Sequence, residues 1–194
     1  MNQTVTTVRR ASVTTDLALV ATFAALVAVC SLVSAPIVVG GVPITLQTFA
    51  VLLAGVVLGA RRAFLAIALY IVVGLVGVPV FAGATGGFGV LAGPSVGYLL
   101  SFPFAAAVAG GWLTLAQRRG WRPVAVHAAV GVVLATLVVY AAGVPVLAWR
   151  TGMSLHAAFT YNLGFVPFDA VKAALAVIVG LAVLRAFPDL RRRA

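Results

Sequence analysis

Acidic side chains are the scarcest feature of this sequence, whose 194 residues contain three of them beside 13 Lys and Arg. All charged residues together make up 8% of the chain, against about 25% in an ordinary soluble domain. So few charges cannot cover the surface of a soluble globule, and 63% of the residues are hydrophobic. The composition therefore excludes an ordinary soluble domain and indicates an integral membrane protein.

Several chemistries lack the residues that they need. Cys30 is the only cysteine, so an intrachain disulfide is excluded. Lys172 is the only lysine, so the chain has no Gly-x-x-x-x-Gly-Lys loop, and we expect no ATP hydrolysis by that route. His127 and His156 are isolated, and no nucleophile–base pair is visible. We therefore expect no catalytic residue, no metal site and no cofactor in this chain, which is not predicted to be an enzyme.

Long apolar runs predict an all-α integral membrane protein, a compact bundle of six transmembrane helices. A helix needs about 20 apolar residues to span a bilayer. The predicted helices cover residues 17–33, 44–58, 63–78, 96–115, 123–142 and 167–187. Gly40, Gly41 and Pro43 break the chain after the first helix, and residues 61 and 62 form a short turn. The connection at 143–165 contains Arg150 and is expected to hold a short interfacial helix.

The arginines set the orientation of this bundle, because Lys and Arg collect in cytoplasmic loops. With six helices, one side holds eleven of the 13 cations. These are Arg9, Arg10, Arg61, Arg62, Arg118, Arg119, Arg122, Arg185, Arg191, Arg192 and Arg193. The other side holds Arg150 alone, so residues 1–16 and 188–194 are predicted to be cytoplasmic tails of a single domain over 1–194. The small, separated groups do not form the basic groove that a nucleic-acid partner requires.

Asp169 and Lys172 are the only oppositely charged pair inside a predicted membrane helix. A charge at the bilayer centre costs about 2.5–3.5 kcal/mol on insertion scales. The i, i+3 spacing places both side chains on one helical face, and Asp169 lies in the first turn, where the positive helix end favours a carboxylate. This pattern indicates a ligand site in the outer part of the membrane. The alternative is a structural ion pair that fixes the helix.

The outer connection at 79–97 is too rich in glycine for a packed helix. Irregular backbone at membrane depth is tolerated where it is buried or lines a cavity. Phe81, Phe88 and Tyr98 are therefore candidates for contact with a ligand, unless the segment is a mobile external loop. Residues 87–92 match a dinucleotide pattern by letter, but they follow no strand, so we reject that interpretation.

Polar side chains elsewhere on the outer side extend this candidate site. Thr45 and Gln47 follow the first break in the chain, next to Thr48, and can form hydrogen bonds into an outer cavity. Each of them alone is more often a helix cap or an interfacial residue. Asn162 lies seven residues before Asp169 and shares its face if the helix continues that far.

Small residues recur one turn apart on the first predicted helix. The pairs are Ala21 with Ala25 and Ala24 with Ala28. Such spacing allows close helix approach in lipid, as does the pair Gly55 and Gly59 on the second helix. Contact with another subunit and ordinary packing inside the bundle explain this pattern equally well.

Taken together, these residues resemble the BioY family, the biotin-specific substrate-binding (S) components of energy-coupling-factor (ECF) transporters. The resemblance extends from about residue 16 to residue 187. Its most specific segments are 41–49 (Gly-Val-Pro-Ile-Thr-Leu-Gln-Thr-Phe), 77–83 (Gly-Val-Pro-Val-Phe-Ala-Gly), Gly93-Pro94 with Gly97-Tyr98, and Asn162 with Pro167, Asp169 and Lys172. One departure is Phe168, where the family usually has glycine.

The resemblance implies uptake of biotin across the cell membrane of a prokaryote. It implies partners as well, namely a coupling membrane protein, contacted through the alanine pairs, and two cytoplasmic ATPases that hydrolyse ATP. Action without these subunits, as a homo-oligomer, stays open. The nearest alternatives are an S component for a different vitamin, a small channel and, third, an intramembrane enzyme.

The resemblance also suggests roles for the candidate residues. Asp169 is expected to accept ureido N–H bonds, and Lys172 to hold Asp169 charged or to meet a ligand oxygen. Neutral hydrogen bonds would come from Asn162, Gln47 and Thr45. Phe81, Phe88 and Tyr98 would form apolar walls.

Overall fold

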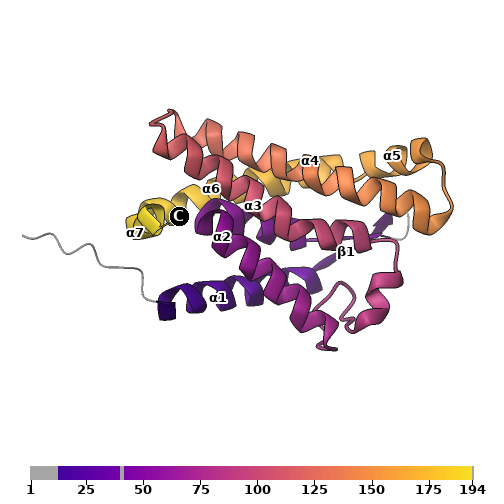
Figure 1. The fold of residues 1–194 in the computed structure, drawn as a ribbon. Helices are drawn as coiled ribbons and strands as arrows, with labels where there is room; N and C mark the ends of the chain where they lie inside the picture. The colour runs from indigo at the N-terminus through magenta and orange to yellow at the C-terminus, as the bar shows by residue number, and fades with distance from the viewer. Residues whose placement is uncertain (1–12, 40–41, 194) are drawn as a thin grey trace, which may run out of the picture.

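The computed structural model of the chain describes residues 13–39 and 42–193 (Figure 1). Its elements are α1 (Val13–Leu32), β1 (Ser34–Val39), β2 (Val42–Thr45), α2 (Gln47–Leu75), the 3-10 helix η1 (Phe88–Ala92), α3 (Val96–Arg118), α4 (Val124–Thr151), α5 (Leu155–Leu163), α6 (Val166–Ala186) and α7 (Pro188–Arg193). The two strands pair in antiparallel orientation, and the remaining elements are helical. The all-α class is thus confirmed over these residues, apart from one short hairpin.

Five of the described helices are long and apolar enough to cross a membrane. They are α1, α2, α3, α4 and α6, with mean hydropathies between 1.6 and 2.3. A helix that is apolar all round is stable only inside lipid or a protein core. The chain is therefore a multi-pass membrane protein.

The chain reverses direction inside α2, at Gly59. This residue has φ 75° and ψ 177°, a backbone conformation that is essentially restricted to glycine. The side chains of Gln47 and Tyr70 meet at 2.9 Å, although residues that far apart in a straight helix are separated by about 35 Å. Residues 47–58 and 60–75 are therefore two antiparallel halves. They correspond to the predicted helices 44–58 and 63–78, but the turn lies at Gly59 rather than at the arginines that follow it.

Glycine also allows α3 to approach this reversal closely. A Cβ atom added at Gly110 would lie 2.5 Å from the carbonyl carbon of Gly59. One added at Gly55 would lie 2.7 Å from the carbonyl oxygen of Ala106. Both distances are too short for a real side chain, so close contact between α2 and α3 requires glycine at these positions.

The beginning of the chain differs from the prediction in two places. Helix α1 begins at Val13, so Asp16 lies in its first turn rather than in a tail, and its carboxylate pairs with Arg62 at 2.9 Å. After α1 the chain forms the β1–β2 hairpin, which was not predicted because the glycines at 40 and 41 indicated only a break. Those glycines lie outside the described residues, as do residues 1–12 of the predicted tail with Arg9 and Arg10.

The largest error concerns α4, which continues to Thr151 instead of ending at residue 142. Gly143 and Pro145 both lie within the helix, and proline inside membrane helices is tolerated when neighbouring groups compensate. The predicted long connection is thus mostly helical, and Arg150 belongs to the last turn of α4. The expected short helix is α5. Helices α3 and α6 agree with their predicted bounds to within three residues.

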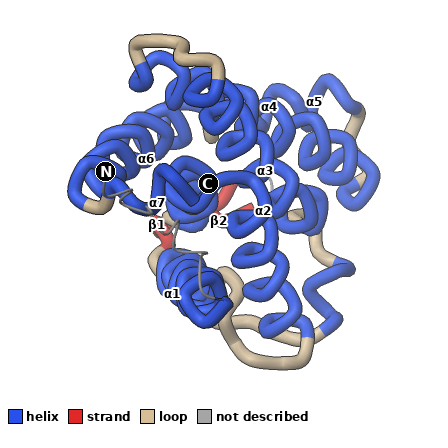
Figure 2. The backbone as a smooth tube through the Cα atoms, turned by 60° about the vertical axis from the view of Figure 1, so that its left-hand side comes forward, coloured by secondary structure: helices blue, strands red, loops and turns tan. Residues whose placement is uncertain are grey.

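Figure 1 shows the bundle with two different ends. One end, which we call the arginine end, contains the start of α1, the reversal in α2, the α3–α4 turn and the end of α6. Its arginines include Arg61, Arg62, Arg118, Arg119, Arg122 and Arg185. The opposite end, which we call the cavity end, holds the hairpin, the 76–95 loop with η1, and α5. Helices α1 and α6 bury the smallest shares of their side chains, 17% and 22%, and lie at the periphery in Figure 2.

Candidate functional site

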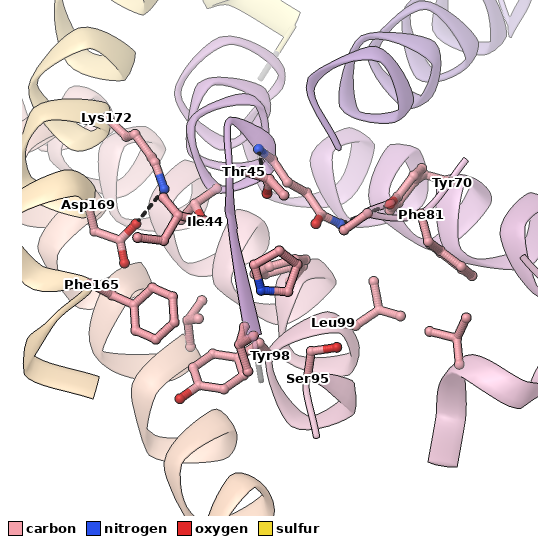
Figure 3. Close-up of a pocket in the computed structure, with 18 of the residues that line it drawn as sticks. Ile44, Thr45, Tyr70, Phe81, Ser95, Tyr98, Leu99, Phe165, Asp169 and Lys172 are labelled. Atoms are coloured by element: carbon pink, nitrogen blue, oxygen red, sulfur yellow. Dashed lines mark hydrogen bonds and ion pairs between the residues drawn. The ribbon is translucent and has the colours of Figure 1, made fainter. Parts of the chain in front are cut away.

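A cavity of about 150 Å³ opens at the cavity end of the bundle (Figure 3). Six elements or loops contribute to its wall, and segments far apart in the sequence meet there. The lining residues are Val42, Pro43, Ile44, Thr45, Gln47, Thr48, Tyr70, Phe81, Ala82, Thr85, Val90, Ser95, Tyr98, Leu99, Phe102, Val139, Tyr140, Phe165, Asp169 and Lys172. The wall is thus mainly apolar and aromatic, with a few polar groups, as is usual for small-molecule sites.

The two intramembrane charges lie together in this wall. Lys172 Nζ is 3.0 Å from Asp169 Oδ1, and the residues are 7% and 6% exposed. Helix α6 has proline near its first position, so Asp169 lies in the first turn, where unpaired backbone N–H groups favour a negative charge. Figure 3 shows both side chains extending from α6 into the cavity. Burial of two charges is tolerated here because they pair and because polar neighbours complete their hydrogen bonds.

Tyr140, on α4, holds the second oxygen of the same carboxylate. Its hydroxyl donates to Asp169 Oδ2 at 2.7 Å. An ionised carboxylate has about four acceptor positions, and these two contacts leave others for a ligand. Sequence reasoning missed Tyr140, since a single tyrosine in an apolar helix gives no sign of the direction in which it points. The carboxylate is therefore fixed from two helices before any ligand contacts it.

A second polar chain crosses the opposite wall of the cavity. Gln47 Nε2 donates to the hydroxyl of Tyr70 at 2.9 Å, and that hydroxyl donates to the carbonyl oxygen of Val80 at 3.2 Å. The ring of Tyr70 meets Phe81 edge-on, with centroids 5.4 Å apart. Thr45 Oγ1 accepts from the backbone N–H of Gln47 at 3.2 Å, the capping role that was weighed against ligand contact. These bonds fasten the 76–95 loop to both halves of α2.

Asn162 lies outside the cavity wall and contacts a residue that forms it. It is 1% exposed, lies on α5 outside the lining, and its Oδ1 accepts a hydrogen bond from Tyr98 at 3.0 Å. Gly143 provides the space for the tyrosine ring, since a Cβ at that position would lie 2.3 Å from it. Asn162 thus positions Tyr98, which faces the cavity next to Phe165.

Two phenylalanines lie away from the cavity. Phe88, on η1, is 70% exposed and does not line the wall. The geometry therefore does not bring it together with the other candidate residues. Phe168, which replaces the usual family glycine, is 40% exposed and also absent from the lining. Its side chain leaves the wall unaltered.

The alanine pairs of α1 separate into two faces. Ala24 is buried and Ala28 is half-buried, so this pair packs against the bundle. Ala21 and Ala25 are exposed. Only the second pair is available to another protein.

The cavity suits binding better than covalent chemistry. Residues 93–97 spell Gly-x-Ser-x-Gly, and Ser95 lines the wall. The segment follows η1 rather than a strand, and the lining contains no histidine, so the context of a hydrolase nucleophile is not met. Among the described residues, no three His, Cys, Asp or Glu side chains lie close enough to hold a metal.

Comparisons with known proteins agree with this arrangement. The sequence matches the BioY family over residues 1–189. It is 35% identical to the biotin transporter BioY of Rhizobium etli, over 93% of this chain and 99% of that protein. It is 40% identical to the probable biotin transporter BioY of Pyrococcus horikoshii, over 84% and 93% of the two chains.

A solved structure gives the same fold. It is the crystal structure of the S-component for biotin from an ECF-type ABC transporter, with a TM-score of 0.82 and 26% identity. The match covers 89% of this chain and 92% of that one. On the family match and the extent of these similarities, the chain belongs to the BioY family.

Proposed function

We propose that this protein takes up biotin, binding it at the cavity end as the S component of an ECF-type transporter. The observation that carries the proposal is the match to the biotin S-component over 89% of the chain, together with a cavity that contains a buried, oriented carboxylate. Membership in a family of transporters supports a transport protein rather than an enzyme.

The cavity matches the chemistry of biotin, which combines a ureido ring, an apolar body and a carboxylate. Asp169 accepts the ureido N–H groups, and Lys172 pairs with Asp169 or meets a ligand oxygen. Gln47 and Thr45 supply neutral hydrogen bonds, and Phe81 and Tyr98 form apolar walls. Asn162 acts through Tyr98 rather than by contact. The cavity is smaller than the roughly 300–1,000 Å³ of typical ligand sites, so a bound ligand also fills its open mouth.

The proposed topology has six crossings and both chain ends in the cytoplasm of a prokaryote. Counting the halves of α2 separately gives six apolar helical segments, which supports this number. The clustering of arginines at one end supports a cytoplasmic location for that end. The cavity then opens to the outside of the cell membrane.

The proposed partners are a coupling membrane protein and two cytoplasmic ATPases, which supply ATP hydrolysis. Ala21 and Ala25 on the exposed face of α1 offer a smooth surface to the coupling protein. A homo-oligomer is the alternative. Co-purification from the native membrane, followed by identification of the bound subunits, separates these two assemblies.

Binding by purified protein in detergent tests the ligand. We expect biotin to bind and riboflavin and thiamine not to compete, whereas competition by either would indicate an S component for another vitamin. Asp169→Asn and Lys172→Ala should each weaken biotin binding by at least about tenfold, the lower limit for a hydrogen bond to a charged group. Asp16→Asn, at the arginine end, is the control. Wild-type affinity in both cavity variants, with folding intact, would contradict the assignment.

A channel is disfavoured by the packing of the arginine end. Backbone atoms of α2 and α3 approach so closely at Gly59 and Gly110 that not even a methyl group fits between them. No continuous polar path is expected through that contact. Ion flux in proteoliposomes should therefore equal that of empty vesicles.

A further inference from the structure

A second cavity, of about 300 Å³, lies at the arginine end between the start of α4 and the end of α6. Its lining residues are Arg122, Pro123, Val124, Ala125, Leu181, Leu184 and Arg185. Two cations thus face an otherwise apolar wall. This composition fits a ligand that has an anionic group joined to a hydrocarbon part.

The chain cannot supply the counter-charge for these arginines by itself. It contains three acidic residues against 13 cations. Asp169 is paired with Lys172, and Asp16 with Arg62. One acidic side chain, that of Asp189, is left for all the other arginines, so most of the positive charge at this end is open to anions from outside the chain.

The position of the cavity favours an anion anchored in the membrane. It lies where α4 begins and α6 ends, and the ends of membrane-spanning helices meet the lipid headgroup region. Trp121, the residue before Arg122, packs its ring 5.5 Å from that of His127, and tryptophan is enriched at this interface. The first backbone N–H groups of α4 lack helical partners and add a partial positive charge to the same wall. Basic pockets between membrane helices on the cytoplasmic side bind acidic lipid headgroups.

We propose that this cavity binds an anionic phospholipid, whose phosphate pairs with Arg122 and Arg185. The guanidinium groups form bidentate hydrogen bonds with phosphate oxygens, and Leu181 and Leu184 contact the first part of an acyl chain. Five of the seven lining residues are apolar and two are arginines, which favours a lipid over a free phosphate. The inference rests on insertion in a membrane and does not depend on which ligand enters the other cavity.

Native mass spectrometry of the intact protein in detergent tests this site. Phosphatidylglycerol and phosphatidylcholine with identical acyl chains serve as probes. The wild-type protein should retain phosphatidylglycerol at least about tenfold better than phosphatidylcholine. The double variant Arg122→Gln/Arg185→Gln should lose this preference. The matched control Arg61→Gln/Arg118→Gln, which removes the same charge from exposed arginines at the same end, should keep it.

Three outcomes would overturn the proposal. One is equal loss in the control, which indicates general attraction between charges. Another is equal retention of the two lipids by the wild-type protein. The third is displacement of the lipid by glycerol phosphate, which indicates a soluble phosphate site.

A second measurement on the wild-type protein alone keeps the test decisive if the double variant fails to fold. Phosphatidylglycerol should raise the unfolding temperature, and phosphatidylcholine should not. Biotin binding by both double variants should equal that of the wild type. Loss of lipid binding with intact biotin binding, or the reverse, shows which of the two proposals fails.

Discussion

The two ends of this bundle differ in what they do with charge. At the cavity end, Asp169 and Lys172 are both buried and held by hydrogen bonds from two helices. At the arginine end, most described cations are exposed, and the buried one, Arg62, reaches the half-exposed carboxylate of Asp16. Removal of a charge from water costs several kcal/mol, whereas an exposed charge costs almost nothing. In the proposed function, charge at the arginine end therefore sets the orientation of the chain, while charge at the cavity end binds a ligand.

The largest effect on stability is expected from removing only one of the two charges of the buried Asp169–Lys172 pair. Lys172→Met leaves Asp169 as an uncompensated buried charge and should lower the free energy of unfolding by about 3–5 kcal/mol. Asp169→Asn/Lys172→Met removes both charges and should recover most of this stability without recovering biotin binding. Thermal unfolding and biotin titration measure the two properties. Recovery of binding in the double variant would mean that the pair is purely structural.

The second-largest effect is expected from adding a methyl group at the contact between α2 and α3. Gly110→Ala places a Cβ atom 2.5 Å from backbone atoms and should destabilise the protein by about 1–3 kcal/mol. Gly111→Ala is the matched control, because its Cβ atom would lie 3.6 Å from the Cβ atom of Ala60, an ordinary van der Waals distance. The unfolding temperature should fall in the first variant only. An equal fall in the unfolding temperature of both variants would show that α2 and α3 do not pack closely at Gly110.

Tyr140→Phe should affect binding more than stability. It removes the hydroxyl that orients Asp169, so biotin affinity should fall about tenfold, equivalent to about 1.4 kcal/mol. Tyr161→Phe, on the exposed side of α5, is the control and should bind as the wild type does. Unchanged affinity in Tyr140→Phe would mean that α6 alone orients the carboxylate.

The smallest effect is expected at the arginine end. Asp16→Asn breaks the pair with Arg62, in which the acid is 38% exposed, and should cost less than about 1 kcal/mol. Its effect on the unfolding temperature should shrink further at high salt, and biotin affinity should stay unchanged. A loss as large as that of Lys172→Met would remove the contrast between the two ends.

The site was predictable where charge or a local motif carried the information. Asp169 and Lys172 stand out in an apolar helix, and Thr45, Gln47, Phe81 and Tyr98 belong to the segments that resemble the family. All six line the same cavity.

Other contributors could not be read from the sequence for physical reasons. Tyr70 and Tyr140 are single tyrosines in apolar helices, where only the rotation of the helix decides between the cavity and lipid. Phe88 was expected in the site because it belongs to the glycine-rich connection at 79–97. It lies instead on the 3-10 helix η1 with its side chain exposed. In the fold, Gly143 lies inside α4, beyond the predicted end of that helix, and makes room for Tyr98, a tertiary contact with no local signal.

The reversal at Gly59 has a consequence for how far a ligand must travel. Gln47 lines the cavity, and the turn lies at the arginine end, so the helical half between them has 12 residues and a length of about 18 Å. The hydrocarbon core of a bilayer is about 30 Å thick. In the proposed topology, a molecule bound next to Gln47 would already have passed more than a third of that thickness, and one short helix with its glycine contacts would remain to be crossed.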